Sequence, residues 1–166
     1  MPFSLNYVGR YVLVALLAAC SGCPPVPEDA LEPNDTPETA TSLSPGLPIE
    51  ARAVQDNLDV FVVEAGPDQT IVFTFEHLGD DNCAAFTVTA PDLQVLYRDN
   101  NSFCGREFTT PTAVEGASLQ STSTGGYILR VPAQLQGEYL LTVDELGEVD
   151  NVFDFVWRYR LTAALE

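Results

Sequence analysis

The sequence predicts an all-β fold, a sandwich of two antiparallel sheets with about eight strands. Beyond Pro48, apolar residues recur with a period of two in short runs, and Gly, Pro, Asn and Asp separate these runs. Alternation of this kind is typical of antiparallel strands with one buried face. The 3.6-residue period of an amphipathic helix is nearly absent, so the sequence indicates no large helical element.

Aromatic and aliphatic residues dominate one face of each expected strand. Because one face of each sheet has to be buried, we interpret the period-two aromatics as core. An exposed platform of rings that stack on sugars is the alternative interpretation. The expected strands lie at residues 60–63, 69–76, 86–90, 93–97, 127–131, 139–143 and 153–161.

The charge balance of the chain excludes one class of partner. The 166 residues include 24 Asp and Glu against seven basic residues, all of them Arg, and the net charge is -17. Such a field repels phosphate backbones, so we expect no nucleic-acid partner. The acidity has two interpretations: surface carboxylates keep an exported protein soluble, or they attract a basic partner.

The first 19 residues have the features of a lipoprotein signal peptide. One basic residue, Arg10, precedes an apolar run at residues 11–19 that is too short to span a bilayer. The run ends in Leu17-Ala18-Ala19-Cys20, which resembles the bacterial lipobox, in which the cysteine thiol receives diacylglycerol before cleavage. An ordinary secretory signal and an uncleaved anchor are the alternatives.

The lipobox resemblance implies that Cys20 is acylated, with palmitate among its chains, and that a lipid anchor holds the protein in the membrane of the cell envelope. Cys23 is a less suitable acceptor, because Cys20 occupies the preceding position where leucine is preferred. Ser21, in place of Asp, implies sorting to the outer membrane. The folded part is therefore expected to be extracytoplasmic.

A proline-rich segment follows the lipid site. Seven of the 12 prolines lie between residues 21 and 48, and prolines at this density exclude a helix. We expect residues 20–30 to form an extended tether. Residues 31–166 are expected to form the sandwich domain, in which the last 22 residues, 145–166, add a C-terminal strand.

Two cysteines of the expected domain, Cys83 and Cys104, lie in polar segments on either side of a predicted hairpin. In an oxidising compartment we expect them to form a disulfide, which stabilises a fold by about 3 kcal/mol in the chain-entropy model. A metal site built from both thiolates is the weaker alternative, because there is no Cys-x-x-Cys spacing and His77 is the only histidine.

Two acidic segments carry a family resemblance. The first is Glu32-Pro33-Asn34-Asp35, and the second is Asp56-Asn57-Leu58-Asp59, which leads into the run at 60–63. Two later segments with a Gly-Tyr pattern, 125–127 and 137–139, complete the match from about Leu31 to Val143. This pattern resembles the bacterial pre-peptidase C-terminal domain, which occurs beside secreted proteases and is related to collagen-binding modules.

The resemblance implies a jelly-roll-like sandwich and, as in the calcium-binding members of the family, a Ca²⁺ site. Ca²⁺ takes six to eight hard oxygen ligands, which two separate acidic segments could largely supply. Asp and Asn before strands are also common turn formers, which is the alternative. Val60 departs from the family's usual aromatic residue, and no collagen-binding residue can be matched. Position by position, the resemblance nominates Glu32, Asn34, Asp35, Asp56 and Asp59.

No catalytic constellation is recognisable, so we expect no enzyme. His77 has no serine elbow or cysteine partner beside it. We expect a membrane-tethered, non-catalytic binding or accessory module with an extracellular protein or polysaccharide ligand. One alternative is a structural or chaperone-like accessory protein for exported proteins, with an exposed edge strand around residues 152–162 as its contact. The last is a hydrolase with an unrecognised site.

Overall fold

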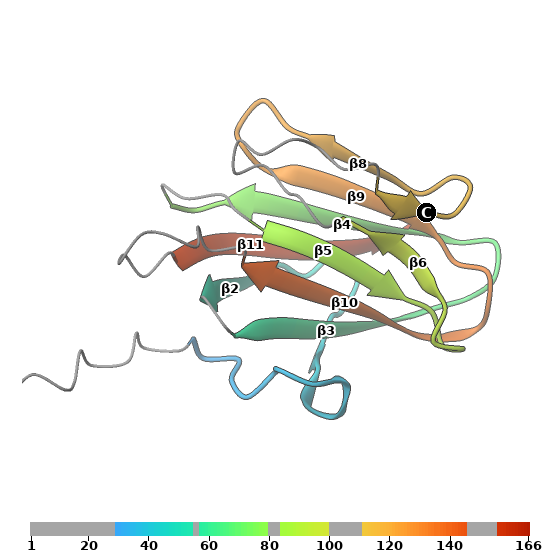
Figure 1. The fold of residues 1–166 in the computed structure, drawn as a ribbon, viewed down its shortest axis with the longest axis horizontal. Coiled ribbons are helices and arrows are strands. Elements are labelled where there is room, and N and C mark those ends of the chain that lie inside the picture. Colours follow the sequence, from blue (N-terminus) through green and yellow to red (C-terminus); the bar gives the residue numbers. More distant parts are fainter. Residues whose placement is uncertain (1–28, 55–56, 80–83, 100–110, 146–155) are drawn as a thin grey trace, which may run out of the picture.

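Two packed β-sheets form the structure, a computed structural model that describes residues 29–54, 57–79, 84–99, 111–145 and 156–166. Within these residues, one sheet has six strands in the order β1-β3-β10-β5-β6-β7, and the other has five in the order β2-β11-β4-β9-β8 (Figure 1). Neighbouring strands are antiparallel, except for the parallel pair β1 and β3. The predicted all-β sandwich is confirmed.

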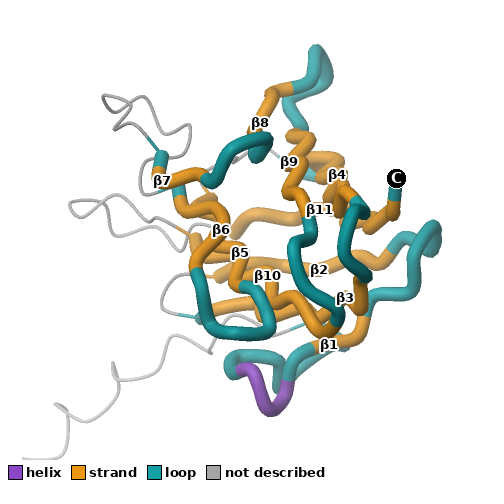
Figure 2. Tube along the Cα trace, turned by 90° about the vertical axis from the view of Figure 1, so that its right-hand side faces the viewer, coloured by secondary structure: helices purple, strands orange, loops and turns teal. Residues whose placement is uncertain are grey.

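The described strands range from two to ten residues, and one turn of 3-10 helix, η1 (Pro37–Thr39), precedes them (Figure 2). No helix among the described residues has the length and hydropathy needed to cross a membrane. The strands are β1 (Thr41–Ser42), β2 (Ile49–Val54), β3 (Leu58–Ala65), β4 (Thr70–His77), β5 (Ala84–Thr89), β6 (Val95–Arg98), β7 (Thr112–Ala113), β8 (Ser118–Ser121), β9 (Tyr127–Pro132), β10 (Gly137–Glu145) and β11 (Val156–Leu165).

Every strand expected from the alternation corresponds to an observed strand, with two differences. Leu93 was expected to start β6, but it lies in the preceding turn, where a φ of 68° and 79% exposure exclude it from the ladder. The structure also has more than the eight or so strands expected, because β1, β2, β7 and β8 were not predicted. Two of these have only two residues, which is too short for alternation to be recognised.

The prediction of an exposed edge strand around residues 152–162 is wrong for the part that the structure describes. β11 lies inside its sheet and pairs with β2 on one side and with β4 on the other. Trp157 and Tyr159 on this strand are completely buried. The C-terminal strand is therefore part of the core, and with neighbours on both sides it offers no free edge to a partner.

The aromatic stripes pack between the sheets, which confirms that they are core. Phe75 of β4 lies 4.5 Å from Phe86 of β5 between ring centroids, so these rings join the two sheets. On β11, Trp157 and Tyr159 stack at 4.3 Å. The indole nitrogen Nε1 of Trp157 donates to Nδ1 of His77 at 3.0 Å, which gives the half-buried histidine a packing role.

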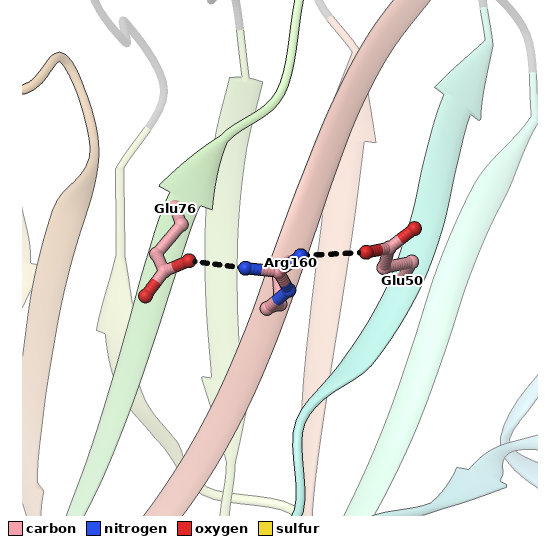
Figure 3. A network of polar contacts seen from close by, with 3 residues as sticks. All are labelled: Glu50, Glu76 and Arg160. Carbon is pink, nitrogen blue, oxygen red and sulfur yellow. Dashed lines mark hydrogen bonds and ion pairs between the residues drawn. The ribbon is translucent and has the colours of Figure 1, made fainter.

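Charge is distributed unequally over the outer faces of the two sheets. Of the five described arginines, only Arg98 belongs to the six-stranded sheet. The other four lie on the five-stranded sheet, where Arg160 of β11 bridges Glu50 of β2 at 2.8 Å and Glu76 of β4 at 2.9 Å (Figure 3). On that sheet, acidic side chains therefore have cationic neighbours. The four arginines are Arg52, Arg130, Arg158 and Arg160.

Candidate functional site

Residues 29–40, called here the amino-terminal segment, are bound to the sandwich by hydrogen bonds from backbone nitrogens of its strands. The carboxylate of Asp29 accepts hydrogen bonds from the backbone nitrogen of Arg52 in β2 at 2.7 Å and from that of Leu31 at 2.8 Å. The backbone nitrogen of Val60 in β3 donates to the carbonyl oxygen of Asn34 at 2.7 Å. The segment is therefore attached to two strands that belong to different sheets.

Glu32 and Asn34 form the polar centre of this attachment. Oε2 of Glu32 accepts from the backbone nitrogen of Asn34 at 3.0 Å, and Oε1 accepts from Nδ2 of Asn57 at 2.9 Å. The Asn34 side chain is fully buried. With its amide nitrogen turned toward Glu32, it donates to Oε2 at 3.0 Å and to Oε1 at 3.2 Å.

Asp59, at the start of β3, is a buried carboxylic acid with a partner on the opposite sheet. Only 1% of its surface is exposed, and the hydroxyl of Tyr159 in β11, itself buried, donates to its Oδ2 at 2.5 Å. A buried carboxylate costs free energy unless a hydrogen bond, a proton or a cation compensates its charge. The Asp59–Tyr159 contact thus joins the sheets at the point where the amino-terminal segment covers them.

Burial sets the protonation of this cluster. Loss of hydration raises the pKa of Asp59 to about 7; the Tyr159 hydrogen bond opposes this rise, and the negative charges of Asp29 and Glu32 add to it. Burial and the neighbouring carboxylate of Asp35 also raise the pKa of Glu32. Like charges are therefore held together here, and a proton or a bound cation would relieve their repulsion.

The structure brings together three of the residues that the sequence nominated. Glu32, Asn34 and Asp59 share one cluster, and the exposed Asp35 lies near enough to influence Glu32 electrostatically. The other site predictions, for Asp56 and for the cysteines, lie outside the described residues and stay predictions; the cysteines are Cys20, Cys83 and Cys104.

Sequence reasoning missed three members of the cluster. Tyr159 was assigned to the core by its period-two position, which conceals the polar role of its hydroxyl group. Asp29 was assigned to the tether because it precedes the acidic motif. Asn57 lies inside the second acidic segment, and this position in the sequence could have identified it as a partner of Glu32.

The donor set can bind a proton or a hard cation. Its oxygen atoms belong to carboxylates, an amide and a phenol, and no sulfur or imidazole ligand takes part in the contacts described above. Within the described ranges, no three Asp, Glu, His or Cys side chains lie close enough to hold a metal ion by themselves. A cation site here would need ligands in addition to the described carboxylates.

Comparison with known proteins finds similarity in solved structures alone, since no family model and no curated protein matches the sequence. One similar structure is PliG of Aeromonas hydrophila, a periplasmic inhibitor of g-type lysozyme, with 15% identity, a TM-score of 0.43 and coverage of 76% of this chain and 97% of that one. Another is the pre-peptidase C-terminal domain of a collagenase from Bacillus anthracis, with 11% identity, a TM-score of 0.46 and coverage of 83% and 97%.

The buried acid predicts an unusual pH dependence in the presence of a chelator. The pKa of Asp59 is about 7 in the folded protein against 3.8 ordinarily, so between these values the folded state binds the extra proton. Its contribution to the free energy of unfolding is complete below about pH 4 and is lost as the pH rises through about 7. We therefore expect the melting temperature of Asp59→Asn to exceed that of the parent by a larger margin at pH 8 than at pH 5, where only the first part of the contribution has been lost.

Thermal melts followed by circular dichroism at both pH values test this expectation. Asp92→Asn is the matched control, because Asp92 lies in an exposed turn and its side-chain oxygen accepts a hydrogen bond from Gln94 that asparagine can also accept. This control should follow the parent at each pH. A melting difference between Asp59→Asn and the parent that stays constant from pH 5 to pH 8 would contradict the assigned titration.

Proposed function

We propose that the protein is a lipid-tethered, non-catalytic binding domain of the cell envelope, and that Ca²⁺ at the acidic cluster fixes its amino-terminal segment to the sandwich. The observation that carries the proposal is the buried attachment of Asn34 and Asp59, since it lies where the chain leaves the predicted tether. A tethered domain needs a firm attachment at this point, because any force on the tether reaches the fold through the segment.

The contacts of the cluster support a cation in several ways. Glu32 lies close enough to Asp59 that its negative charge raises the pKa of the buried acid, and the charge of Asp29 adds to this effect. The Asn34 amide lies 3.0 and 3.2 Å from the two Glu32 oxygens, so rotation of this amide on metal binding would place its oxygen beside the carboxylate as a further ligand. Calcium would thus replace the proton that the buried acid otherwise needs.

The remaining ligands of this proposed site come from the two acidic segments. Asp35 follows Asn34 directly, and Asp56 precedes Asn57, whose side chain contacts Glu32. Together with water, they would bring the number of oxygen ligands toward the six to eight that Ca²⁺ takes. Ca²⁺ in this site would offset the repulsion among the carboxylates and link the segment to β3.

The proposed attachment of the amino-terminal segment to the sandwich by Ca²⁺ is called here the latch. A calcium titration of thermal stability tests it. For purified full-length protein we expect the melting temperature to rise with Ca²⁺, corresponding to about 2.7 kcal/mol at a hundredfold excess over Kd. The increase should be larger at pH 8 than at pH 5, because the ligands must be ionised to bind the metal. Scanning calorimetry with Ca²⁺, with Mg²⁺ and with chelator measures the effect.

Variants distinguish specific binding of Ca²⁺ at the acidic cluster from general screening of the protein's negative charge by the ion. Asp59→Asn and Asp56→Ala should lose most of the calcium-dependent increase, whereas Asp92→Asn should retain it, since the described contact of Asp92 is with Gln94 in the β5–β6 turn and not with a residue of the cluster. Equal increases in all four proteins, or an equal response to Mg²⁺ and Ca²⁺, would mean that calcium acts by screening and that the latch is wrong.

The lipid anchor is tested separately in cells. Metabolic labelling with an alkynyl fatty acid should modify the full-length protein, and Cys20→Ser should abolish the label and release the domain from the membrane fraction. Cys23→Ser is the matched control, because it removes a thiol three positions later without changing the lipobox. Retained label in Cys20→Ser, or loss of it in Cys23→Ser alone, would refute Cys20 as the acceptor.

A further inference from the structure

A shallow cleft of about 250 Å³ lies between the amino-terminal segment and the β5–β6 turn. β10 forms its floor on the outer face of the six-stranded sheet, because Glu138 is exposed and Leu140 is half-buried, whereas Tyr139 between them points into the core. Five of the six lining residues are apolar. They are Pro37, Ala90, Pro91, Leu93, Glu138 and Leu140.

The β5–β6 turn leaves the side chain of Leu93 exposed to solvent at the edge of this cleft. Leu93 has a φ of 68° and is 79% exposed, which combines a left-handed backbone with an unburied large apolar side chain. Such backbone conformations are uncommon for leucine and persist where the surroundings enforce them, often at binding sites. This position leaves a large apolar side chain available to a partner.

Hydrogen bonds and a close contact fix the turn. The backbone nitrogen of Leu93 donates to the carbonyl oxygen of Ala90 at 2.9 Å, and that of Ala90 donates to Gln94 at 2.8 Å. Gly137 lies against Pro91 so closely that a Cβ atom on it would be 3.0 Å from Cγ of the proline. These contacts hold the wall in place without a ligand, and a preorganised surface loses less entropy on binding.

The rim of the cleft is acidic and has no basic residue nearby in the sequence. Glu138 lines the cleft, Glu64 of β3 stands opposite it in the strand register, and Glu38 follows the lining residue Pro37. η1, β3, β5, β10 and the β5–β6 turn contain no Lys or Arg. On the other sheet, by contrast, Glu50 and Glu76 are both paired with Arg160 (Figure 3).

We propose that this cleft binds a basic protein, through an apolar side chain flanked by lysine or arginine. The apolar side chain would lie between Leu93 and Pro37, and the cationic groups would meet Glu138 and Glu64. Charge complementarity favours this partner, since an acidic rim attracts cations and repels acidic proteins. No aromatic ring lines the cleft, which disfavours a polysaccharide, because sugars commonly stack on rings.

This inference rests on the proposed function and names the class of partner that the binding domain takes. It also connects the cleft to the latch, since Pro37 belongs to the amino-terminal segment. Docking of the segment through Asn34 therefore completes one wall of the cleft. The same contacts that hold the segment on β3 would shape the surface that the partner meets.

A fluorescein-labelled peptide that alternates Lys and Leu tests the cleft by fluorescence anisotropy on purified full-length protein. Leu93→Ser and the double variant Glu64→Gln with Glu138→Gln should each raise Kd about tenfold, equivalent to about 1.4 kcal/mol. Matched controls are Leu47→Ser, at a leucine that is 63% exposed outside the cleft, and Glu115→Gln, at an exposed acid in another turn. Both controls should bind like the parent.

Three results would overturn the proposal. One is equal affinity for a peptide of alternating Glu and Leu. Another is an equal loss of affinity in the cleft and control variants, which indicates attraction to the net charge alone. The third is displacement of the peptide by a neutral oligosaccharide, which would assign the cleft to a glycan.

Calcium-dependent melting of the same variants separates this proposal from the latch. Leu93→Ser should keep the calcium response of the parent, because Leu93 is not among the residues in the described contacts of the acidic cluster. A preserved calcium response with no cleft-dependent peptide binding refutes the cleft alone. Cleft-dependent binding with no calcium response supports the cleft and refutes the latch.

Discussion

The contact between Asp59 and Tyr159 constrains the rest of this structure. A carboxyl group in a dry interior has to be hydrogen-bonded, and its charge has to be removed by a proton or balanced by a cation. Among the described residues, the side-chain donor that reaches it across the sandwich is a buried phenol from the other sheet, at 2.5 Å. The two sheets and the segment above them must therefore stay in register for the acid to remain satisfied.

The amino-terminal segment matters for the structure because it covers the buried carboxyl group of Asp59. Asn34 covers the buried acid and accepts a hydrogen bond from Val60, while Asp29 accepts one from Arg52 in the other sheet. Farther along the same segment, Pro37 forms a wall of the apolar cleft. A stretch of 12 residues, 29–40, thus connects the predicted tether, the acidic cluster and the proposed partner surface.

The sequence predicted the fold where burial imposes a strict period. Phe73 and Phe75 of β4 lie at alternate positions and are fully buried, as expected.

The order of the strands could not be predicted in this way, because alternation reports which face of a strand is buried but not which strands are neighbours. For this reason β11 was expected at an edge although it pairs on both sides. Strand β2 was missed because its inward residues, Ala51 and Ala53, are small and produce a weak pattern.

The candidate site was predictable in part for similar physical reasons. Glu32, Asn34 and Asp59 belong to recognisable acidic segments, and a family resemblance directed attention to them. The partner hydroxyl of Tyr159 lies 100 residues along the chain from Asp59 and resembles any other core aromatic in sequence. Local sequence also does not report a left-handed backbone at a leucine, so the exposed position of Leu93 emerges from the structure alone.

The central claim is that the amino-terminal segment is a part of the folded sandwich. Hydrogen exchange of the Val60 amide, measured by NMR, tests it most directly, because this amide donates to Asn34 of the segment. We predict that Val60 exchanges as slowly as Leu141 in the central strand β10, through unfolding of the whole domain. Exchange of Val60 at the rate of an unprotected peptide, with Leu141 still protected, would contradict the account.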